Sequence, residues 1–208
     1  DWFSAENQGE WVGSGRVTHL EIGDFAGHPA SLAWSRLPGS TVSLRPEDIV
    51  DFEEPFPDVA KRMPGLKAPA VWLPHAILGI SSSGLVEDRT SGRFGPYAGQ
   101  LFVADQGQSK INRLMMEKVK GVWQGAVIPF REGFDCGIIR LTYGEDGALF
   151  AGETARGWGS VGPAQQGLER LEWTGQVPFE IKEINAEPDG FRLTFTAPVD
   201  RATAEKPE

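Results

Sequence analysis

Three acidic residues stand at the same place in three related stretches of this sequence. Each acid follows a phenylalanine by three residues and precedes a loop with glycine or amide side chains, and the pairs are Phe3/Glu6, Phe102/Asp105 and Phe150/Glu153. Carboxylates beside amides could bind calcium, which takes about six to eight oxygen ligands, or the hydroxyls of a sugar. Alternatively, each acid caps a turn by accepting hydrogen bonds from backbone N–H groups, which for any single acid is the more common role.

The other reactive side chains have fewer partners in the sequence. His75, in LPHAIL, is the best candidate for a site histidine, although no partner stands at metal-ligand or triad spacing. His19, in an alternating strand, and His28, before a proline, are expected to make structural hydrogen bonds. Cys136 is the only cysteine and is expected in the core. No nucleophile elbow, Walker loop or Gly-x-Gly-x-x-Gly fingerprint indicates a hydrolase or a nucleotide-binding protein.

The acids must be positioned by short strands, because short apolar runs alternate with turn residues along most of the chain. The related stretches recur at intervals of roughly fifty residues or twice that, and such a period made of strands is typical of a β-propeller with four-stranded blades. The expected strands are Gly84–Glu87, Gln100–Ala104, Ile111–Glu117, Gln124–Pro129, Ile138–Tyr143, Ala148–Gly152, Leu168–Trp173 and Phe179–Ile184. The sequence therefore predicts an all-β fold, a partial β-propeller with about two complete blades and part of another.

The two ends of this repeat are uneven. The N-terminal copy begins in the second strand of its blade, so we expect open sheet edges that another chain or further propeller blades must cover. Residues 1–175 are expected to hold the blades, with a proline-rich surface connection over about 37–70 and a helical turn near 46–52. Residues 176–208 are expected to form a strand pair around a Pro-Asp-Gly turn, followed by a polar tail.

In a propeller, the loops between second and third strands and between blades emerge on one face, which usually carries the site. The candidate ligand-binding residues on that face are Glu6, Asn7, Gln8, His75, Asp105, Gln106, Arg131, Glu153, Arg156 and Trp158, with Asp135 beside them. Glu6, Asp105 and Glu153 are the candidate calcium ligands. Most of the tryptophans are expected to pack between blades. Trp158, flanked by glycines, is expected to be exposed for a sugar or a partner.

The overall charge limits the class of partner. The formal net charge is −9, which argues against a nucleic-acid partner, because phosphate binding needs Lys and Arg. No apolar run reaches the roughly 20 residues that span a bilayer. Membrane association is therefore expected only through other proteins.

Three groups of motifs point to a known family. ENQGEW with HLEIGDFAGHPA, PAVWLP with FGPYAGQLFVADQ and INRL, and IRLTYGEDGALFAGET with RGWG and LERLEWTG resemble the glucose/sorbosone dehydrogenase-like propeller family. The similarity covers about residues 1–200 and is closest to the large exported "membrane-bound dehydrogenase" proteins, which often carry c-type haem domains. The resemblance implies a six-bladed propeller of which this chain matches the C-terminal half, and a periplasmic or otherwise extracytoplasmic location. In quinoprotein members it also implies sugar oxidation with pyrroloquinoline quinone (PQQ) and calcium.

The chain departs from those quinoprotein members at their cofactor positions. Their catalytic histidine lies in an earlier blade, their two cofactor-binding arginines fall on Gly137 and Ile139, and their lysine falls near Gly107. A tricarboxylate quinone needs several cations, so no cofactor is expected in this chain and catalysis by it alone is not expected. Two hypotheses remain. The chain is a non-catalytic propeller module that binds or braces a larger assembly, or it is the C-terminal half of a quinone-dependent sugar or alcohol dehydrogenase.

Overall fold

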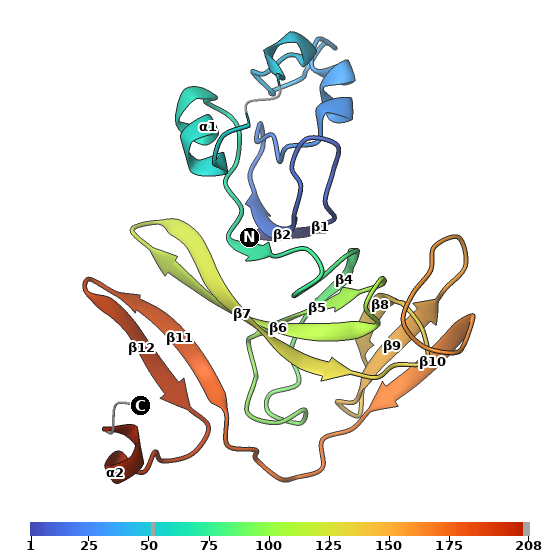
Figure 1. Ribbon diagram of the computed structural model, residues 1–208, viewed down its shortest axis with the longest axis vertical. Helices are drawn as coiled ribbons and strands as arrows, with labels where there is room; N and C mark the ends of the chain where they lie inside the picture. The colour runs from blue at the N-terminus through green and yellow to red at the C-terminus, as the bar shows by residue number, and fades with distance from the viewer. Residues whose placement is uncertain (51–52, 206–208) are drawn as a thin grey trace.

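The computed structural model describes residues 1–50 and 53–205, and most of its regular structure is antiparallel β-sheet (Figure 1). The first sheet is β1 (Trp2–Glu6), β2 (Gly15–Leu20) and β3 (Val71–Leu73), and the second is β4 (Ser82–Glu87), β5 (Leu101–Asp105), β6 (Lys110–Val119) and β7 (Val122–Glu132). The third sheet is β8 (Ile138–Tyr143), β9 (Leu149–Thr154) and β10 (Gln166–Leu171), and the hairpin of β11 (Ile181–Glu187) and β12 (Gly190–Phe195) follows. The helices are short: α1 (Phe56–Arg62), α2 (Arg201–Ala204), and two 3₁₀ turns at Pro29–Trp34 and Pro46–Asp48.

The repeat seen in the sequence reappears in the strand register. In each of the first three sheets the phenylalanine and the acid share one strand, and both face equivalent positions of the next strand. The Cα partners are Phe3↔His19 and Glu6↔Arg16, Phe102↔Arg113 and Asp105↔Lys110, and Phe150↔Arg170 and Glu153↔Gly167. Each acid therefore lies at the mouth of the turn that joins its strand to the next.

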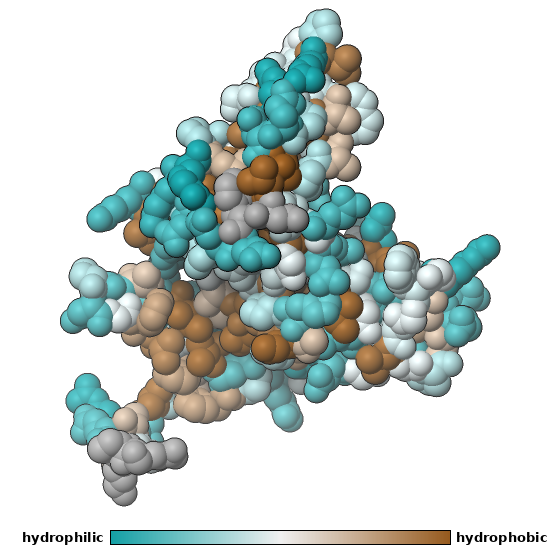
Figure 2. Space-filling view, turned by 45° about the horizontal axis from the view of Figure 1, so that its top comes forward, coloured by the Kyte–Doolittle hydropathy of each residue, from teal (hydrophilic) through white to brown (hydrophobic). Residues whose placement is uncertain are grey.

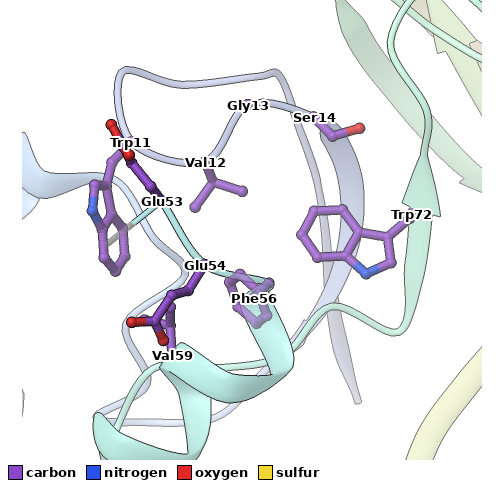
Figure 3. A pocket seen from close by; sticks show the side chains of 9 residues that line it. All are labelled: Trp11, Val12, Gly13, Ser14, Glu53, Glu54, Phe56, Val59 and Trp72. Atoms are coloured by element: carbon purple, nitrogen blue, oxygen red, sulfur yellow. The ribbon is translucent and has the colours of Figure 1, made fainter. Parts of the chain in front are cut away.

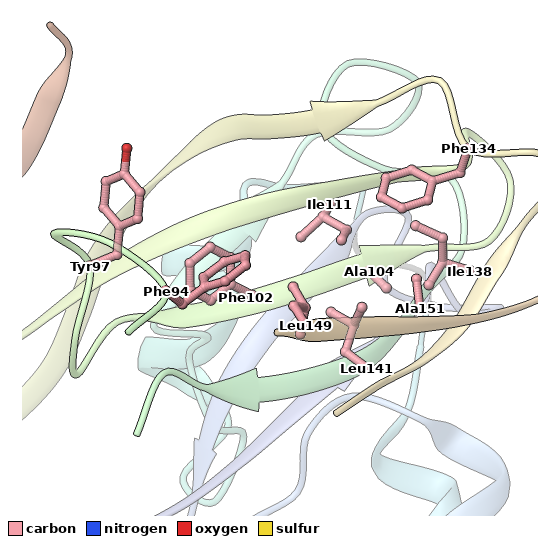
Figure 4. Close-up of a cluster of buried hydrophobic side chains, with 10 residues drawn as sticks. All are labelled: Phe94, Tyr97, Phe102, Ala104, Ile111, Phe134, Ile138, Leu141, Leu149 and Ala151. Atoms are coloured by element: carbon pink, nitrogen blue, oxygen red, sulfur yellow. The ribbon is translucent and has the colours of Figure 1, made fainter. Parts of the chain in front are cut away.

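The hydrophobic core lies between the stacked sheets, with the four-stranded sheet in the middle. Alternate residues of β5 supply both sides, because successive side chains of a strand point to opposite faces. Phe102 packs with Leu141 and Leu149 of the third sheet (Figure 4), whereas Val103 packs with Val17 and Leu73 of the first. This alternation explains why the middle sheet contains the longest continuous run of buried residues.

One predicted strand pairing is wrong. The sequence suggested a fourth strand at Phe179–Ile184 beside β10, but β11 pairs with β12, and the third sheet has three strands among the described residues. The reason is local: Glu187 pairs with Gly190, so Pro188 and Asp189 form a two-residue turn. Closing so short a loop costs little entropy, and the strand pair predicted from Pro-Asp-Gly forms there instead.

The C-terminal hairpin is held against the middle sheet by a buried arginine. Arg113, fully buried in β6, donates to the carbonyl oxygens of Ile181 (2.7 Å) and Lys182 (3.2 Å), and its guanidinium lies 4.3 Å from the centre of the Tyr97 ring. Glu180 forms an ion pair with it at 3.4 Å. Burial lowers the pKa of Arg113 although Glu180 acts in the opposite direction.

The proline-rich connection contains more structure than its composition suggested. The chain between β2 and β3 holds α1, both 3₁₀ turns and a small core of its own, which lies at the top of Figure 1. That core consists of Phe25, Leu32, Leu44, Val59, Met63 and Leu66. The helical turn predicted over 46–52 is a 3₁₀ turn at Pro46–Asp48, and residues 51 and 52 lie outside the described part of the chain.

Candidate functional site

Asp105, at the end of β5, is the most completely engaged of the three repeat acids. Its side chain is buried, and Oδ2 accepts hydrogen bonds from the backbone N–H of Ile80 (2.7 Å) and of Ser81 (2.8 Å). Oδ1 accepts one from the N–H of Gln108 at 2.7 Å. This carboxylate joins the start of the middle sheet to the turn after β5, which is the turn-capping role considered above.

Glu6, at the end of β1, forms an ion pair inside the first sheet. Its Oε2 lies 3.0 Å from Nε of Arg16, the residue opposite it on β2, and accepts a hydrogen bond from Thr18 Oγ1 at 2.9 Å. Arg16 is 1% exposed and also donates to the carbonyl oxygen of Ala26 at 2.6 Å. Burial lowers the pKa of Arg16, and the neighbouring Glu6 raises it, so the pair is an electrostatic contact within the fold.

Glu153, on β9, lies in a more acidic environment. Its Oε2 accepts the backbone N–H of Cys136 at 3.0 Å, while Oε1 is buried without a hydrogen-bond partner among the described residues. Burial raises the pKa of Glu153, and the neighbouring carboxylates Glu169 and Asp135 add to the rise. Cys136 is fully buried, as expected, and burial and Glu153 together raise the pKa of its thiol. The thiol is therefore held in its unreactive, protonated form.

The turns of the first three sheets are linked through Ser81 and Gln106. Asn7 Nδ2 donates to Ser81 Oγ (3.2 Å), and the carbonyl oxygen of Ser81 accepts the N–H of Gln106 (2.8 Å). Gln106 Nε2 in turn donates to the carbonyl oxygens of Thr154 (3.2 Å) and Trp158 (3.4 Å). Residues from all three copies are thus neighbours on one loop surface, which we call the loop face.

The remaining candidates lie around this face with fewer contacts. His75, Gln8 and Arg156 are exposed, and Trp158 is 81% exposed. Arg131 lies over the ring of Phe130, 4.5 Å from its centre. Nothing in these positions tests whether the residues bind a ligand, so that role stays a prediction.

Two residues of this region, Ser81 and Glu169, were not among the site residues predicted from the sequence. Ser81 was part of an ordinary Ser-Ser-Ser-Gly turn, and Glu169, whose Oε1 accepts the N–H of Asp135 at 2.8 Å, was part of a strand. Aligning the third strands of the repeat, INRL with LERL, would have shown that an acid replaces Asn112 there. The contact with Glu153 depends on the register of β9 with β10 and could not be read from the sequence.

The cationic residues near the quinone positions of the resembled family, Lys110 and Arg140, both donate to backbone carbonyl oxygens. Lys110 is 7% exposed, and its Nζ donates to the carbonyl oxygen of Ile77 at 2.7 Å. Arg140 donates to the carbonyl oxygen of its neighbour Ile139 at 2.8 Å. In the described residues, no group of three or more His, Cys, Asp or Glu is arranged to hold a metal ion.

Comparisons with known proteins find similarity in three-dimensional structure and none to a family model or a curated sequence. No family model matches the chain, and no curated protein matches it. The structure is similar to that of a candidate oxidoreductase (glucose dehydrogenase) from Thermus thermophilus, with a TM-score of 0.50 and 21% identity. The match covers 81% of this chain and 40% of that protein. The chain therefore has a sugar-dehydrogenase-like all-β fold that spans less than half the length of this neighbour.

Proposed function

We propose that the chain is a non-catalytic, extracytoplasmic β-propeller module, derived from a sugar-dehydrogenase-like propeller, which binds or braces a larger assembly. The observation that carries this proposal is the unequal size of the stacked sheets. The middle sheet has four strands, whereas the sheets on either side have three among residues 1–50 and 53–205. Unpaired sheet edges are sites where another strand can add, so proteins normally cover them.

The edges in question are those of β1 and β10. Within the described part of the chain, β1 pairs only with β2, and β10 pairs only with β9. In the repeat, β1 is equivalent to β5. In the middle sheet β5 pairs with β4 on one side, and β1 has no such partner among the described residues. β10 corresponds to β6 and lacks the outer neighbour that β7 provides. Further propeller blades, from this protein or another, would fill both positions.

A second surface supports attachment to a partner. The C-terminal hairpin and its flanks expose Phe179 (61%), Phe191 (75%) and Leu193 (46%). Figure 2 shows brown, hydrophobic side chains gathered at the lower left, in the region of this hairpin. Exposed apolar clusters of this kind are typical of protein interaction sites. None of the described helices is long and apolar enough to cross a membrane.

The non-catalytic role is supported by how the repeat residues are used. Asp105 accepts hydrogen bonds from backbone amides, Oε2 of Glu6 pairs with a buried arginine, and Lys110 donates to a backbone carbonyl. The alternative is the C-terminal half of a PQQ- and calcium-dependent sugar or alcohol dehydrogenase. The similarity to the Thermus protein favours this alternative, although fold alone does not imply activity.

The test is the native mass of the protein purified from its own source in mild detergent, with co-purifying chains identified. The module hypothesis expects a particle much larger than 22.7 kDa that shows no sugar-dependent dye reduction with added PQQ and calcium. Quinone- and calcium-dependent dye reduction by that particle, lost when this chain is removed, would support the dehydrogenase half instead. A 22.7 kDa monomer would refute the attachment role.

A further inference from the structure

A pocket lined by aromatic residues lies between the β1–β2 loop, β3 and the start of α1. Its volume is about 520 Å³, within the range of about 300–1,000 Å³ that is common for small-molecule sites. Trp11 comes from the β1–β2 loop, Phe56 from α1 and Trp72 from β3. Figure 3 shows the two indoles on opposite sides of the pocket, with Phe56 between them.

The rings are held in place by a hydrogen bond and by contacts with other rings. Trp11 Nε1 donates to the carbonyl oxygen of Val50 at 2.8 Å, and its ring lies 6.1 Å from that of Phe25. Phe56 meets Trp72 edge to face, with 5.2 Å between ring centres and an angle of 78°. Trp72 nevertheless remains 36% exposed. The rings are therefore preorganised, which reduces the entropy lost on binding, and Trp72 is accessible to a ligand.

The charge at the pocket is negative. Glu53 and Glu54 line it, and no Lys, Arg or His is among the described lining residues. Glu54 is paired with Arg62, which lies on α1 outside the lining. Glu53 is exposed and forms no ion pair with another described residue. A ligand here would thus meet aromatic faces and one carboxylate without a compensating cation.

We propose that this pocket binds an organic cation, an alkylated ammonium group with a small apolar body. The faces of tryptophan rings attract such cations through their quadrupoles, and Glu53 adds a direct charge. Val12 and Val59 add apolar surface to the lining, and the hydroxyl of Ser14 already donates to the carbonyl oxygen of Leu73 at 3.0 Å. The carboxylate of Glu53 beside the two indoles, with no basic residue among the described lining residues, favours a cation over a neutral or anionic ligand. This inference does not depend on the propeller role proposed above.

The experiment is calorimetric titration of the purified chain with choline, compared with its neutral isostere 3,3-dimethylbutan-1-ol. Saturable binding of choline is expected, at least about tenfold tighter than binding of the isostere. Glu53→Gln and Trp72→Leu should each weaken choline binding about fivefold or more. The matched control is Trp2→Leu, which removes an 82% exposed indole of β1 outside the pocket and should leave the affinity unchanged.

Three results would overturn the proposal: no saturable binding of choline, equal binding of the neutral isostere, or binding of glucose instead of the cation. If Trp72→Leu unfolds the protein, as shown by a lost thermal transition, the Glu53→Gln variant still tests the proposal. Glu53 is exposed, so its substitution should leave the fold intact, and an unchanged choline affinity would then contradict the role of the carboxylate.

Discussion

At the scale of single residues, the three repeat acids share a position and differ in what they contact. Each stands where its strand enters a turn, and the length of that turn decides the partner. After Asp105 the short turn brings the N–H of Gln108 back to the carboxylate. After Glu153 a longer glycine-rich loop intervenes, and the carboxylate meets the N–H of Cys136 and the carboxyl group of Glu169. Equivalent residues therefore carry different energetic roles.

Replacing Asp105 with alanine should destabilise the protein strongly, by about 2–4 kcal/mol, because three partly buried N–H groups lose their buried acceptor. Urea denaturation measures the change. Asp200→Ala, which removes the exposed cap of α2, should cost much less. If Asp105 instead bound calcium, added calcium would raise the melting temperature of the wild type but not of the variant.

Replacing Glu153 with glutamine should stabilise the protein at neutral pH, by about 1 kcal/mol, because a buried carboxylate beside another acid is removed. The pKa of Glu153 is raised in the folded state, so its favourable contribution is present below the pKa of the unfolded carboxyl and is lost as the pH rises through the folded value. The stability advantage of the variant should therefore grow as the pH rises from acidic towards neutral.

Urea denaturation at several pH values tests this. Glu145→Gln, at an exposed position of the β8–β9 turn, is the control and should change stability little at any pH. An advantage for Glu153→Gln that shrinks with rising pH would show that the carboxylate is stabilised in the fold, contrary to the argument.

At the scale of elements, two positions of β6 contact the C-terminal hairpin: Arg113, and Glu117, which accepts the N–H of Ala186 at 2.9 Å. Arg113 and Arg170 are equivalent in the repeat, since both face the phenylalanine of the preceding strand. Arg113 is fully buried and bonds to the hairpin, whereas the side chain of Arg170 is 43% exposed and pairs with Asp146. The same residue type thus anchors an element in one sheet and lies at the surface in the next.

Replacing Arg113 with alanine should cost about 3 kcal/mol, because the carbonyl oxygen of Ile181 loses the hydrogen bond from this arginine and Glu180 loses its cationic partner. Hydrogen exchange of the backbone amides of residues 181–195 should accelerate more than exchange in β5. Arg170→Ala is the matched control and should change neither stability nor exchange appreciably. Equal effects of both variants would contradict the anchoring role.

At the scale of the whole molecule, the three stacked sheets enclose two hydrophobic clusters, one on each side of the middle sheet, but end at incomplete edges. β10 shows the consequence most clearly, because Leu168 on this edge strand is 73% exposed. An apolar residue on an open strand edge favours association, and a lysine there disfavours it.

Replacing Leu168 with lysine should therefore leave the folding stability of the isolated chain within about 0.5 kcal/mol and reduce its incorporation into the native assembly. Thermal unfolding checks the first outcome, and the native mass and co-purifying chains check the second. Val122→Lys, at the 67% exposed start of β7, is the control. Normal incorporation of the Leu168 variant would show that the β10 edge is not the attachment site.

The sequence by itself determined the local features of this protein. The repeat spacing gave the three related strand pairs, the alternation of apolar residues gave their buried faces, and the Pro-Asp-Gly turn gave the C-terminal hairpin. These features could be predicted because turn chemistry and strand periodicity act between residues that are close along the chain. The position of each acid at the mouth of a turn followed from the same information.

The tertiary structure alone decided the contacts between distant segments. The hydrogen bond from Asn7 to Ser81 joins residues 74 positions apart, and the pocket between Trp11, Phe56 and Trp72 requires the small core between β2 and β3. No local pattern specifies such contacts, because they depend on how the sheets stack and on which side chains the stacking buries. For the same reason the pairing of β11 and the acidic environment of Glu153 became visible only in the folded chain.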